Sequence, residues 1–308
     1  MRKNKQQSKN SIKYKSRVPF ILFATIPVLI NFLIFYVYMN LSSFGMAFIN
    51  KDGQLSIENF LRIIREFQLP SSMIRLSLRN TFLTFGISLI AFPFRVLVPY
   101  FLYKKIPLSG FYRIVFFLPG IIFSVCVALV FTRMIGPTGF IAKAVGDWLD
   151  LGYAPELLSD SRFANATVIL HSLWLGFPGD LIIWSGTFAR IPEEVLEAGR
   201  VDGTTWVSEF TKIILPMVWP TVTLKMVLMF CGIFSASGQV FLLTEGQYGT
   251  STLSSWMYIY LLEHGGASYE SNAFNYMSAM GVVITVLALS ISSIVRKISG
   301  RMHNDVEF

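Results

Sequence analysis

Long apolar runs alternate with short polar stretches along the whole chain. Crossing the hydrocarbon core of a bilayer takes about 20 consecutive apolar residues in a helix. The runs that reach this length cover residues 18–40, 78–103, 111–134, 166–188, 217–243 and 274–295. The pattern predicts an all-α protein, a polytopic transmembrane helical bundle of about six spans. Residues 18–308 are expected to form a single membrane domain after a short tail at 1–17.

The composition agrees with a membrane protein. Hydrophobic residues make up 53% of the chain, charged residues only 14%, and the mean hydropathy is +0.56. So few polar groups could not cover this much apolar surface in water. The net charge of +8 could point to nucleic acid, but the basic residues crowd the first 17 positions or flank the apolar runs. That distribution is typical of membrane orientation, and no nucleic-acid partner is expected.

The basic residues also predict which ends of the spans face the cytoplasm. With the N-terminus inside, 16 of the 26 Lys and Arg residues lie on the cytoplasmic side, 8 on the outer side and 2 within spans. Cytoplasmic segments of membrane proteins carry such an excess. The first apolar run, residues 18–40, is too long for the core of a signal peptide and has no cleavage site, so it is expected to remain as a span. Both termini and residues 190–216 are therefore predicted to be cytoplasmic.

Two outer segments have patterns of their own. Residues 55–67, LSIENFLRIIREF, place apolar side chains at helical spacing with charges opposite, which predicts an amphipathic helix on the outer surface. Residues 136–156 alternate turn residues with short apolar stretches. They predict a small cap that is either re-entrant or on the surface.

Motifs for catalysis and nucleotide binding are absent from the sequence. There is no G-x-x-x-x-G-K-[ST] loop and no H-E-x-x-H, and the three histidines do not cluster with cysteines or carboxylates. Cys126 and Cys231 both lie inside apolar runs, where small packing roles are usual. The chain is not expected to be an enzyme or to hold a metal. Energy for work would have to come from a gradient or from a partner protein.

Residues 193–216, EEVLEAGRVDGTTWVSEFTKIILP, are a polar segment between two apolar runs. Pro192 is placed for the first helical position, and the helix is expected to reach about Val201. Gly203 then permits a left-handed turn, and a threonine at 204–205 is placed to cap a second helix. Pro216 leads into the next span. The pattern predicts a short helix–turn–helix at the cytoplasmic surface.

The charge of this segment indicates a protein partner. Residues 193–209 contain five acidic residues and one basic residue. Helices that lie on lipid headgroups usually carry basic residues toward the anionic leaflet. An acidic helix pair is suited instead to a basic protein surface. An amphipathic loop resting on lipid remains the alternative.

The same segment resembles the EAA loop of ABC-importer permeases. The family pattern is E-A-A, three residues, G, nine residues and I-x-L-P, and this chain has Glu197-Ala198-Gly199, Gly203 and Ile213-Ile214-Leu215-Pro216 at that spacing. Gly199 replaces the usual second alanine. FYRIVFFLPGII and WLGFPGDLIIWSGTFARIPEEVLEAGRVDG resemble the carbohydrate-importer branch, of the maltose and oligosaccharide type. The basic tail and the P-F-I-L-F opening resemble the first of its two paired permeases.

The resemblance implies one half of a translocation path for a carbohydrate, expected to be an oligosaccharide, in a prokaryotic plasma membrane. It implies a second homologous permease, two copies of a cytoplasmic ABC ATPase and an extracellular solute-binding protein as partners, together with membrane lipid. ATP and Mg would be bound by the ATPase, so no cofactor is expected in this chain. The residues implied to couple the path to the ATPase are Glu197, Ala198, Gly199, Asp202, Gly203, Leu215 and Pro216. The alternatives are the same architecture carrying a peptide or polyol phosphate, or a self-contained channel or enzyme.

Polar residues inside the apolar runs are the candidates for the substrate path. Arg95, Asp180 and Lys225 are costly in lipid and are expected to face protein or water, with an Asp180–Lys225 ion pair as one interpretation. The alternative is that Arg95 and Lys225 lie near span ends and extend to the interface. Ser235 and Gln239 are expected on the fifth span, where hydroxyl and amide groups suit sugar recognition. Ordinary small-residue helix packing is the alternative for the serine.

Overall fold

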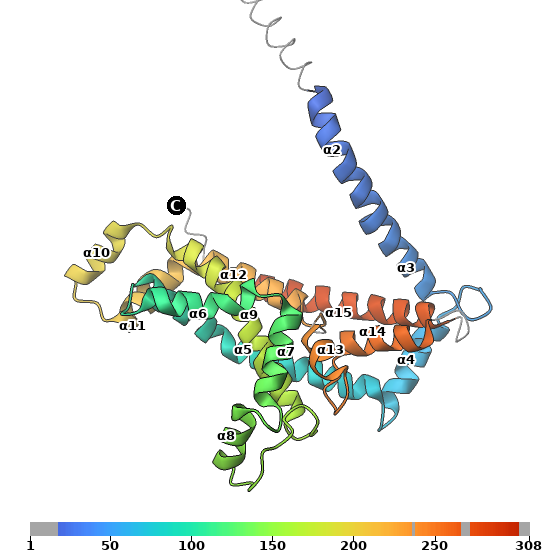
Figure 1. Cartoon of the computed structure of the whole chain (residues 1–308). Helices are drawn as coiled ribbons and strands as arrows, with labels where there is room; N and C mark the ends of the chain where they lie inside the picture. Colours follow the sequence, from blue (N-terminus) through green and yellow to red (C-terminus); the bar gives the residue numbers. More distant parts are fainter. Residues whose placement is uncertain (1–17, 236–237, 266–271, 302–308) are drawn as a thin grey trace, which may run out of the picture. The chain divides into compact units, whose positions relative to one another are not determined.

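The computed structural model describes residues 18–235, 238–265 and 272–301, and this part of the chain is almost entirely helical (Figure 1). An isolated β-bridge joins Ile49 and Leu55. The all-α class expected from the sequence is confirmed. In chain order the elements are α2 (Val18–Phe32), π-helical η1 (Leu33–Tyr38), α3 (Met39–Ala47), α4 (Glu58–Gln68), α5 (Met73–Tyr103), α6 (Ser109–Ile121), α7 (Ser124–Ile135), α8 (Phe140–Trp148), α9 (Ala164–Phe188), α10 (Glu193–Val201), α11 (Trp206–Glu209), π-helical η2 (Phe210–Ile214), α12 (Leu215–Cys231), α13 (Gly238–Thr244), α14 (Leu253–His264) and α15 (Ala273–Arg301).

Five helices are long and apolar enough to cross a membrane, or six if one bent pair counts as a span. The five run over Pro19–Ala47, Met73–Tyr103, Ala164–Phe188, Trp206–Cys231 and Ala273–Ile298, within the described residues. The prediction of about six spans is confirmed at this level. The first span is longer than the expected 18–40, because α2, η1 and α3 follow one another without a break.

The expected third span, residues 111–134, is not one straight helix. Helices α6 and α7 meet at an angle of 108°, with Ile122 in extended conformation between them. A Cβ atom added at Gly120 would lie 2.6 Å from Cβ of Pro178, so the end of α6 packs directly on α9. Such a contact needs a residue without a side chain, and the bend occurs immediately after it.

The expected fifth span, residues 217–243, is wrong at both ends. Helix α12 ends at Cys231 and α13 begins only at Gly238, so Ser235 and Gln239 do not continue it. At the other end, α11, η2 and α12 form one helical run from Trp206 to Cys231. Pro216 has no N–H for the i−4 carbonyl, and the π-helical turn immediately before α12 accommodates that lost hydrogen bond.

The chain divides into two compact units. Unit 1 holds residues 1–63 and 267–282, and unit 2 holds 64–266 and 283–308. In unit 1, Asn59 is 1% exposed; its amide nitrogen donates to the carbonyls of Ala47 and Ile49, and its oxygen accepts from Asn272. This buried amide ties the first turn of α4 to the end of α3 and the start of α15.

Unit 2 contains the main hydrophobic core and positions both candidate sites. Its buried members are Phe92, Val96, Tyr100, Trp184, Phe188, Ile191, Leu196, Ile214, Val218 and Val222. They come from α5, α9, α12 and both helical parts of segment 190–216. The polar segment is therefore anchored by its own apolar residues to the ends of three long helices.

The two segments expected on the outer side form helices as well. Helix α4 confirms the amphipathic helix expected over residues 55–67, while its place on an outer surface stays a prediction. Within residues 136–156 a helix forms, α8, and Ala142 on it packs in a small core with Ile135 and Leu157. The cap therefore folds onto the end of α7.

Candidate coupling loop and polar cavity

Loop 190–216 folds as the predicted helix–turn–helix. Helix α10 ends at Val201, and Gly203 has a φ of +70°, the left-handed region where glycine carries no penalty. The backbone N–H and side-chain hydroxyl of Thr204 both donate to the carbonyl of Gly199, at 3.0 and 2.8 Å. Thr205 caps α11 by accepting from the N–H of Ser208. The predicted turn and threonine cap are thus present, with Pro192 one residue before the helix instead of in it.

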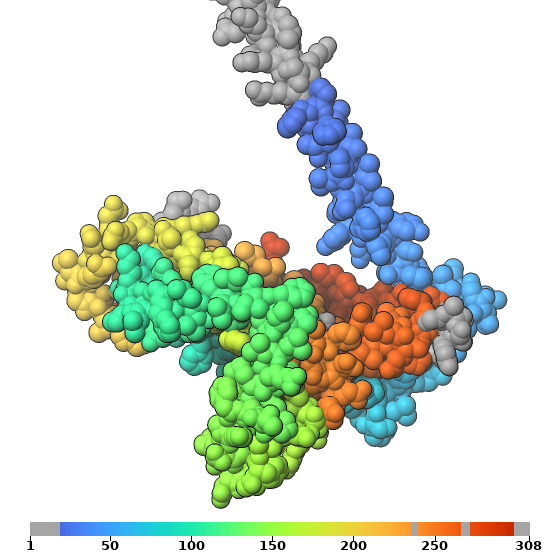
Figure 2. Space-filling view, in the orientation of Figure 1, coloured from blue at the N-terminus to red at the C-terminus, as the bar shows by residue number. Residues whose placement is uncertain are grey.

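Helix α10 has one buried face and one exposed face. Leu196 and Gly199 are buried, whereas Glu197, Ala198 and Asp202 are exposed. Val201 is 88% exposed, which is costly in water for an isolated valine. In the space-filling view the surface of α10 lies open on the face shown (Figure 2).

The inner face of α10 explains the one departure from the family pattern. A Cβ atom added at Gly199 would lie 2.8 Å from Cδ1 of Ile213 and 3.3 Å from Oγ1 of Thr204. Alanine here would require the isoleucine methyl to move by a few tenths of an ångström. Gly199 therefore permits close approach of α10 to η2, while Leu215 and Pro216 are half-buried at the start of α12.

The structure adds an ion pair that the sequence alone did not reveal. Glu209 is 4% exposed, and both of its carboxylate oxygens accept from Nζ of Lys104 at 2.8 Å. The hydroxyl of Tyr100 donates to the same carboxylate at 3.2 Å. The expectation that Glu209 faces a partner together with the other acids is wrong, because its carboxylate is used inside the chain. The acids left on the exposed surface are Glu193, Glu194, Glu197 and Asp202.

A second cluster of charges lies inside unit 2. Asp180 on α9 forms ion pairs with two cations, with Nζ of Lys225 on α12 at 2.5 Å and with Nε of Arg95 on α5 at 2.8 Å. We call these three residues the ion triad. The Asp180–Lys225 pair anticipated from the sequence is present, and Arg95 joins it. Both side chains turn toward α9. Where Arg95 and Lys225 lie relative to the membrane interface stays a prediction.

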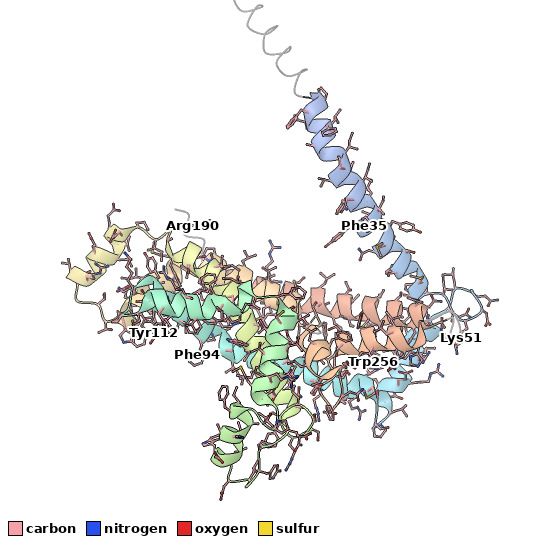
Figure 3. All side chains as sticks on the ribbon, in the orientation of Figure 1. Phe35, Lys51, Phe94, Tyr112, Arg190 and Trp256 are labelled. Atoms are coloured by element: carbon pink, nitrogen blue, oxygen red, sulfur yellow. The ribbon has the colours of Figure 1, made fainter. Side chains whose placement is uncertain are left out.

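Arg95 is held by shape as well as by charge. A Cβ atom added at Gly176 would clash with Nη2 of Arg95, so the guanidinium lies directly on the glycine. Its buried Nε lacks an aligned hydrogen bond among the described residues, and the contact with Asp180 is Coulombic. The preceding residue, Phe94, is labelled in Figure 3 and is 66% exposed, as expected for neighbours that face different sides of a helix.

Arg95 also borders a cavity of about 300 Å³, which we call the polar cavity. Thr84, Ser88 and Arg95 recur at helical spacing on α5, and Asn165, Val168 and Ser172 do so on α9, so each helix presents one stripe. The full lining is Thr84, Ser88, Arg95, Asn165, Val168, Ile169, Ser172, Leu173, Ser235, Gln239, Val240 and Thr252.

The predicted path residues divide between the triad and this cavity. Ser235 and Gln239 line the cavity, and the Gln239 side chain also interacts with the fully buried His171. Asp180 and Lys225 do not line the cavity. Asp180 pairs with Arg95, which does line it, and Lys225 pairs with Asp180. The break after α12 brings Ser235 and Gln239 to the lining from two different segments.

Hydrogen bonds at the start of α5 fix the wall of the cavity near Thr252. The amide of Asn80 donates to the carbonyls of Gly249 and Ser251 at 2.6 and 2.9 Å, and its oxygen accepts from Asn165 at 3.0 Å. Thr81 accepts from the N–H of Leu253. No local signal in the sequence indicates these contacts, because the partners in the 249–253 segment lie 169 to 172 positions away.

The profile of the family described as "Binding-protein-dependent transport system inner membrane component" matches residues 73–304. The chain belongs to this family. Its members are transport components, so the chain is a multi-pass membrane protein of a transport system and not an enzyme. Within the described residues there is no group of three or more His, Cys, Asp or Glu side chains that could hold a metal ion.

Three relatives have sugar-transport names. The chain is 24% identical over 200 residues to the multiple sugar-binding transport system permease protein MsmF of Streptococcus mutans, covering 65% of this chain and 66% of the relative. It is 26% identical over 255 residues to the maltose/maltodextrin permease protein MalF of Vibrio vulnificus, covering 76% and 46%. The arabinooligosaccharides permease protein AraP of Bacillus subtilis is 24% identical over 306 residues, covering 98% and 95%. The chain thus spans about half to two thirds of the length of the first two relatives.

Two solved structures have the same fold. One is a bacterial ABC transporter involved in the import of the acidic polysaccharide alginate, with a TM-score of 0.77, 24% identity and coverage of 94% of this chain and 99% of that chain. The other is a bacterial alginate transporter in complex with an alginate pentasaccharide-bound periplasmic protein, with a TM-score of 0.76, 22% identity and coverage of 94% and 97%. At these identities the likeness bears on the fold alone.

Proposed function

We propose that this chain is a permease subunit of an ATP-driven ABC importer and forms half of the translocation path for a carbohydrate. The observation that carries the proposal is loop 190–216, in a chain of this family. An exposed acidic helix is joined by Gly203 to a helical run that continues to Cys231. A movement of α10 would therefore be transmitted to the membrane span by the helical run Trp206–Cys231 and not by a flexible loop.

The proposed coupling assigns a different task to each part of the loop. Glu197, Ala198 and Asp202 lie on the exposed side of α10, where a separate ATPase would dock. Gly203 sets the direction of α10, while Leu215 and Pro216 begin the span. Closure of the ATPase on ATP would then tilt the run Trp206–Cys231 as a rigid element and alternate access to the cavity.

The proposed partners follow from what this chain lacks. Its sequence has no nucleotide-binding motif, so two copies of a cytoplasmic ATPase would bind ATP and Mg. A second homologous permease would complete the path, and an extracellular binding protein would deliver the solute. The excess of basic residues on the loop 190–216 side supports cytoplasmic termini, in a prokaryotic plasma membrane.

A carbohydrate is the solute that the cavity chemistry favours. The lining supplies five hydroxyl groups, two amides and one guanidinium, which can donate to and accept from sugar hydroxyls. About 300 Å³ is at the small end of ligand pockets, enough for one or two sugar units. The names of MsmF, MalF and AraP support the same class.

Affinity purification in mild detergent tests the assembly. The chain, tagged at one terminus and expressed in its native host, is expected to retain a second permease and an ATPase of the ABC class. Replacing Glu197 with Lys should reduce the retained ATPase at least severalfold, because it reverses a charge on the exposed side of α10. Glu156→Lys, at an exposed acid away from the loop, is the matched control. A chain that purifies alone, or one whose ATPase content is equal in both variants, would contradict the proposal.

A further inference from the structure

The ion triad has more positive than negative charge. It joins one carboxylate, Asp180, to two cations, Arg95 and Lys225, for a net charge of +1. The helices around it do not supply a second acid: α5, α6, α9, α12 and α13 contain Asp180 as their single acidic residue. An unbalanced charge inside a membrane protein is costly unless a ligand, a partner or water offsets it.

The excess charge faces the polar cavity. Arg95 is the triad member that lines it, with 17% of its side chain exposed, whereas the Asp180 side chain is 7% exposed. Both oxygens of the Asp180 carboxylate are therefore paired with cations. The Arg95 guanidinium still has N–H groups that donate to no acceptor among the described residues. Guanidinium groups bind carboxylate and phosphate through paired, charge-assisted hydrogen bonds.

The rest of the cavity is suited to the uncharged part of such a ligand. From Thr84 to Arg95 along α5 the distance is about 16 Å at the helical rise of 1.5 Å per residue. The hydroxyl and amide groups of Ser88, Asn165 and Gln239 lie between or opposite these ends. The Gln239 side chain lines the cavity and also interacts with the ring of the fully buried His171, which holds the amide in place beside the cavity.

We propose that the polar cavity is a subsite for a saccharide unit that bears an anionic group, carboxylate or phosphate. This inference rests on the proposed carbohydrate permease function and names its substrate class. Arg95 contacts the anionic group, and Lys225 and Asp180 position the guanidinium and set the local charge. Gln239 and the hydroxyls bind the sugar ring. The triad also ties three helices together, but a purely structural tie would be satisfied by one neutral ion pair.

Binding measurements on the purified importer complex test this subsite directly. The complex is placed in phosphatidylcholine nanodiscs without the binding protein, so that selectivity belongs to the permease. Tritiated trigalacturonate is compared by equilibrium dialysis with its fully methyl-esterified form, which has the same sugar units without the charge. Glucose 6-phosphate against glucose forms the phosphate arm. In the carboxylate arm or the phosphate arm, we expect the anionic probe to bind at least about tenfold more tightly than its neutral counterpart.

Two sets of variants locate the preference. Arg95→Gln should bring the anionic and neutral affinities within about twofold of each other, and Lys225→Met should reduce the preference at least about threefold by leaving a neutral Arg95–Asp180 pair. Lys225→Arg keeps the charge and should keep the preference. If the Arg95→Gln complex does not assemble, the comparison of Lys225→Met with Lys225→Arg decides alone. Lys225 does not line the cavity, so these two changes alter the charge beside Arg95 without altering the cavity lining.

The outcomes separate this inference from the proposed function. Equal binding of charged and neutral saccharides would overturn the anionic subsite and leave the carbohydrate permease standing. Failure to bind or transport any saccharide would instead contradict the proposed function. An anionic preference that survives both Arg95→Gln and Lys225→Met would place the selectivity elsewhere and overturn the assignment.

Discussion

Two glycines three residues apart on α9 have very different surroundings. Gly176 supports the guanidinium of Arg95, whereas a Cβ atom added at Gly179 would meet nothing within 4 Å. Alanine favours a helix over glycine by about 1 kcal/mol at either position. The difference between the two alanine variants therefore isolates the contact with Arg95.

We expect Gly176→Ala to destabilise the protein relative to Gly179→Ala. The added methyl displaces the guanidinium from its place beside Asp180 and weakens a charged contact worth about 2 kcal/mol. Thermal unfolding of both variants in the same detergent, followed by size-exclusion chromatography, gives the comparison. Equal midpoints for the two variants would show that Arg95 relocates at no cost and that Gly176 has no role in positioning it.

At the residue scale, the sequence predicted those features that depend on a single side chain or a single backbone dihedral angle. The left-handed conformation of Gly203 and the threonine cap follow from local geometry, and both are present. The Asp180–Lys225 pair could be proposed because both charges fall in apolar runs. Arg95 could not be assigned to the same cluster, since its neighbour Gly176 lies 81 positions away and glycine carries no signal of what it supports.

At the scale of elements, the Glu209–Lys104 pair connects loop 190–216 to the end of α5. The pair is bidentate, with Glu209 4% exposed and the Lys104 side chain 26% exposed. Tyr100 adds a third hydrogen bond from the same helix. The pair therefore fixes the second helix of the loop independently of the apolar core.

Glu209→Gln should lower stability by about 2 kcal/mol, because Lys104 would lose its partner while partly buried. The double variant Glu209→Gln with Lys104→Met should recover part of that loss, since neither charge is then left alone. Glu193→Gln, an exposed acid in the same loop, is the control and should change stability by less than about 0.5 kcal/mol. Thermal unfolding in detergent of the unsubstituted protein, Glu209→Gln, Lys104→Met, the double variant and the Glu193→Gln control gives the coupling. A double variant no better than the sum of its single changes would contradict the pair.

Helix existence was predictable for the long apolar runs, but helix continuity was not. A bent pair such as α6 and α7 has the same hydropathy as a straight span, because lipid and protein interior select the same residue types. Next to the bend Gly120 packs against Pro178, and a contact between residues 58 positions apart is tertiary information. The break after Cys231 follows a similar rule, since glycine and serine cluster there but also occur inside unbroken transmembrane helices.

At the scale of the whole molecule, unit 2 contains every residue proposed for coupling and for the path. Arg95 lies on α5 and Lys104 caps the C-terminal end of the same helix, about 14 Å further along at the helical rise. Lys225 and Glu209 lie on the one run Trp206–Cys231. These two helical segments therefore both connect the loop to the ion triad. A tilt of α12 relative to α5 would strain the Glu209–Lys104 pair and the ion triad at the same time.

Gly203 and Gly152 allow coupling to be separated from backbone strain. Both are exposed, both have positive φ (+70° and +69°), and an added Cβ would meet nothing within 4 Å at either place. Valine should cost each site about 1–2 kcal/mol of strain or more. Under the coupling proposal, Gly203→Val abolishes solute-stimulated ATP hydrolysis of the assembled importer, because α10 changes direction, whereas Gly152→Val leaves it near the unsubstituted level. Membrane insertion, followed by detergent extraction and size-exclusion chromatography, should be the same for both. If Gly203→Val keeps both ATPase stimulation and uptake, α10 is not the coupling element. If Gly203→Val and Gly152→Val lose ATPase stimulation and uptake equally, backbone strain is the cause, and loop 190–216 has no special part in coupling.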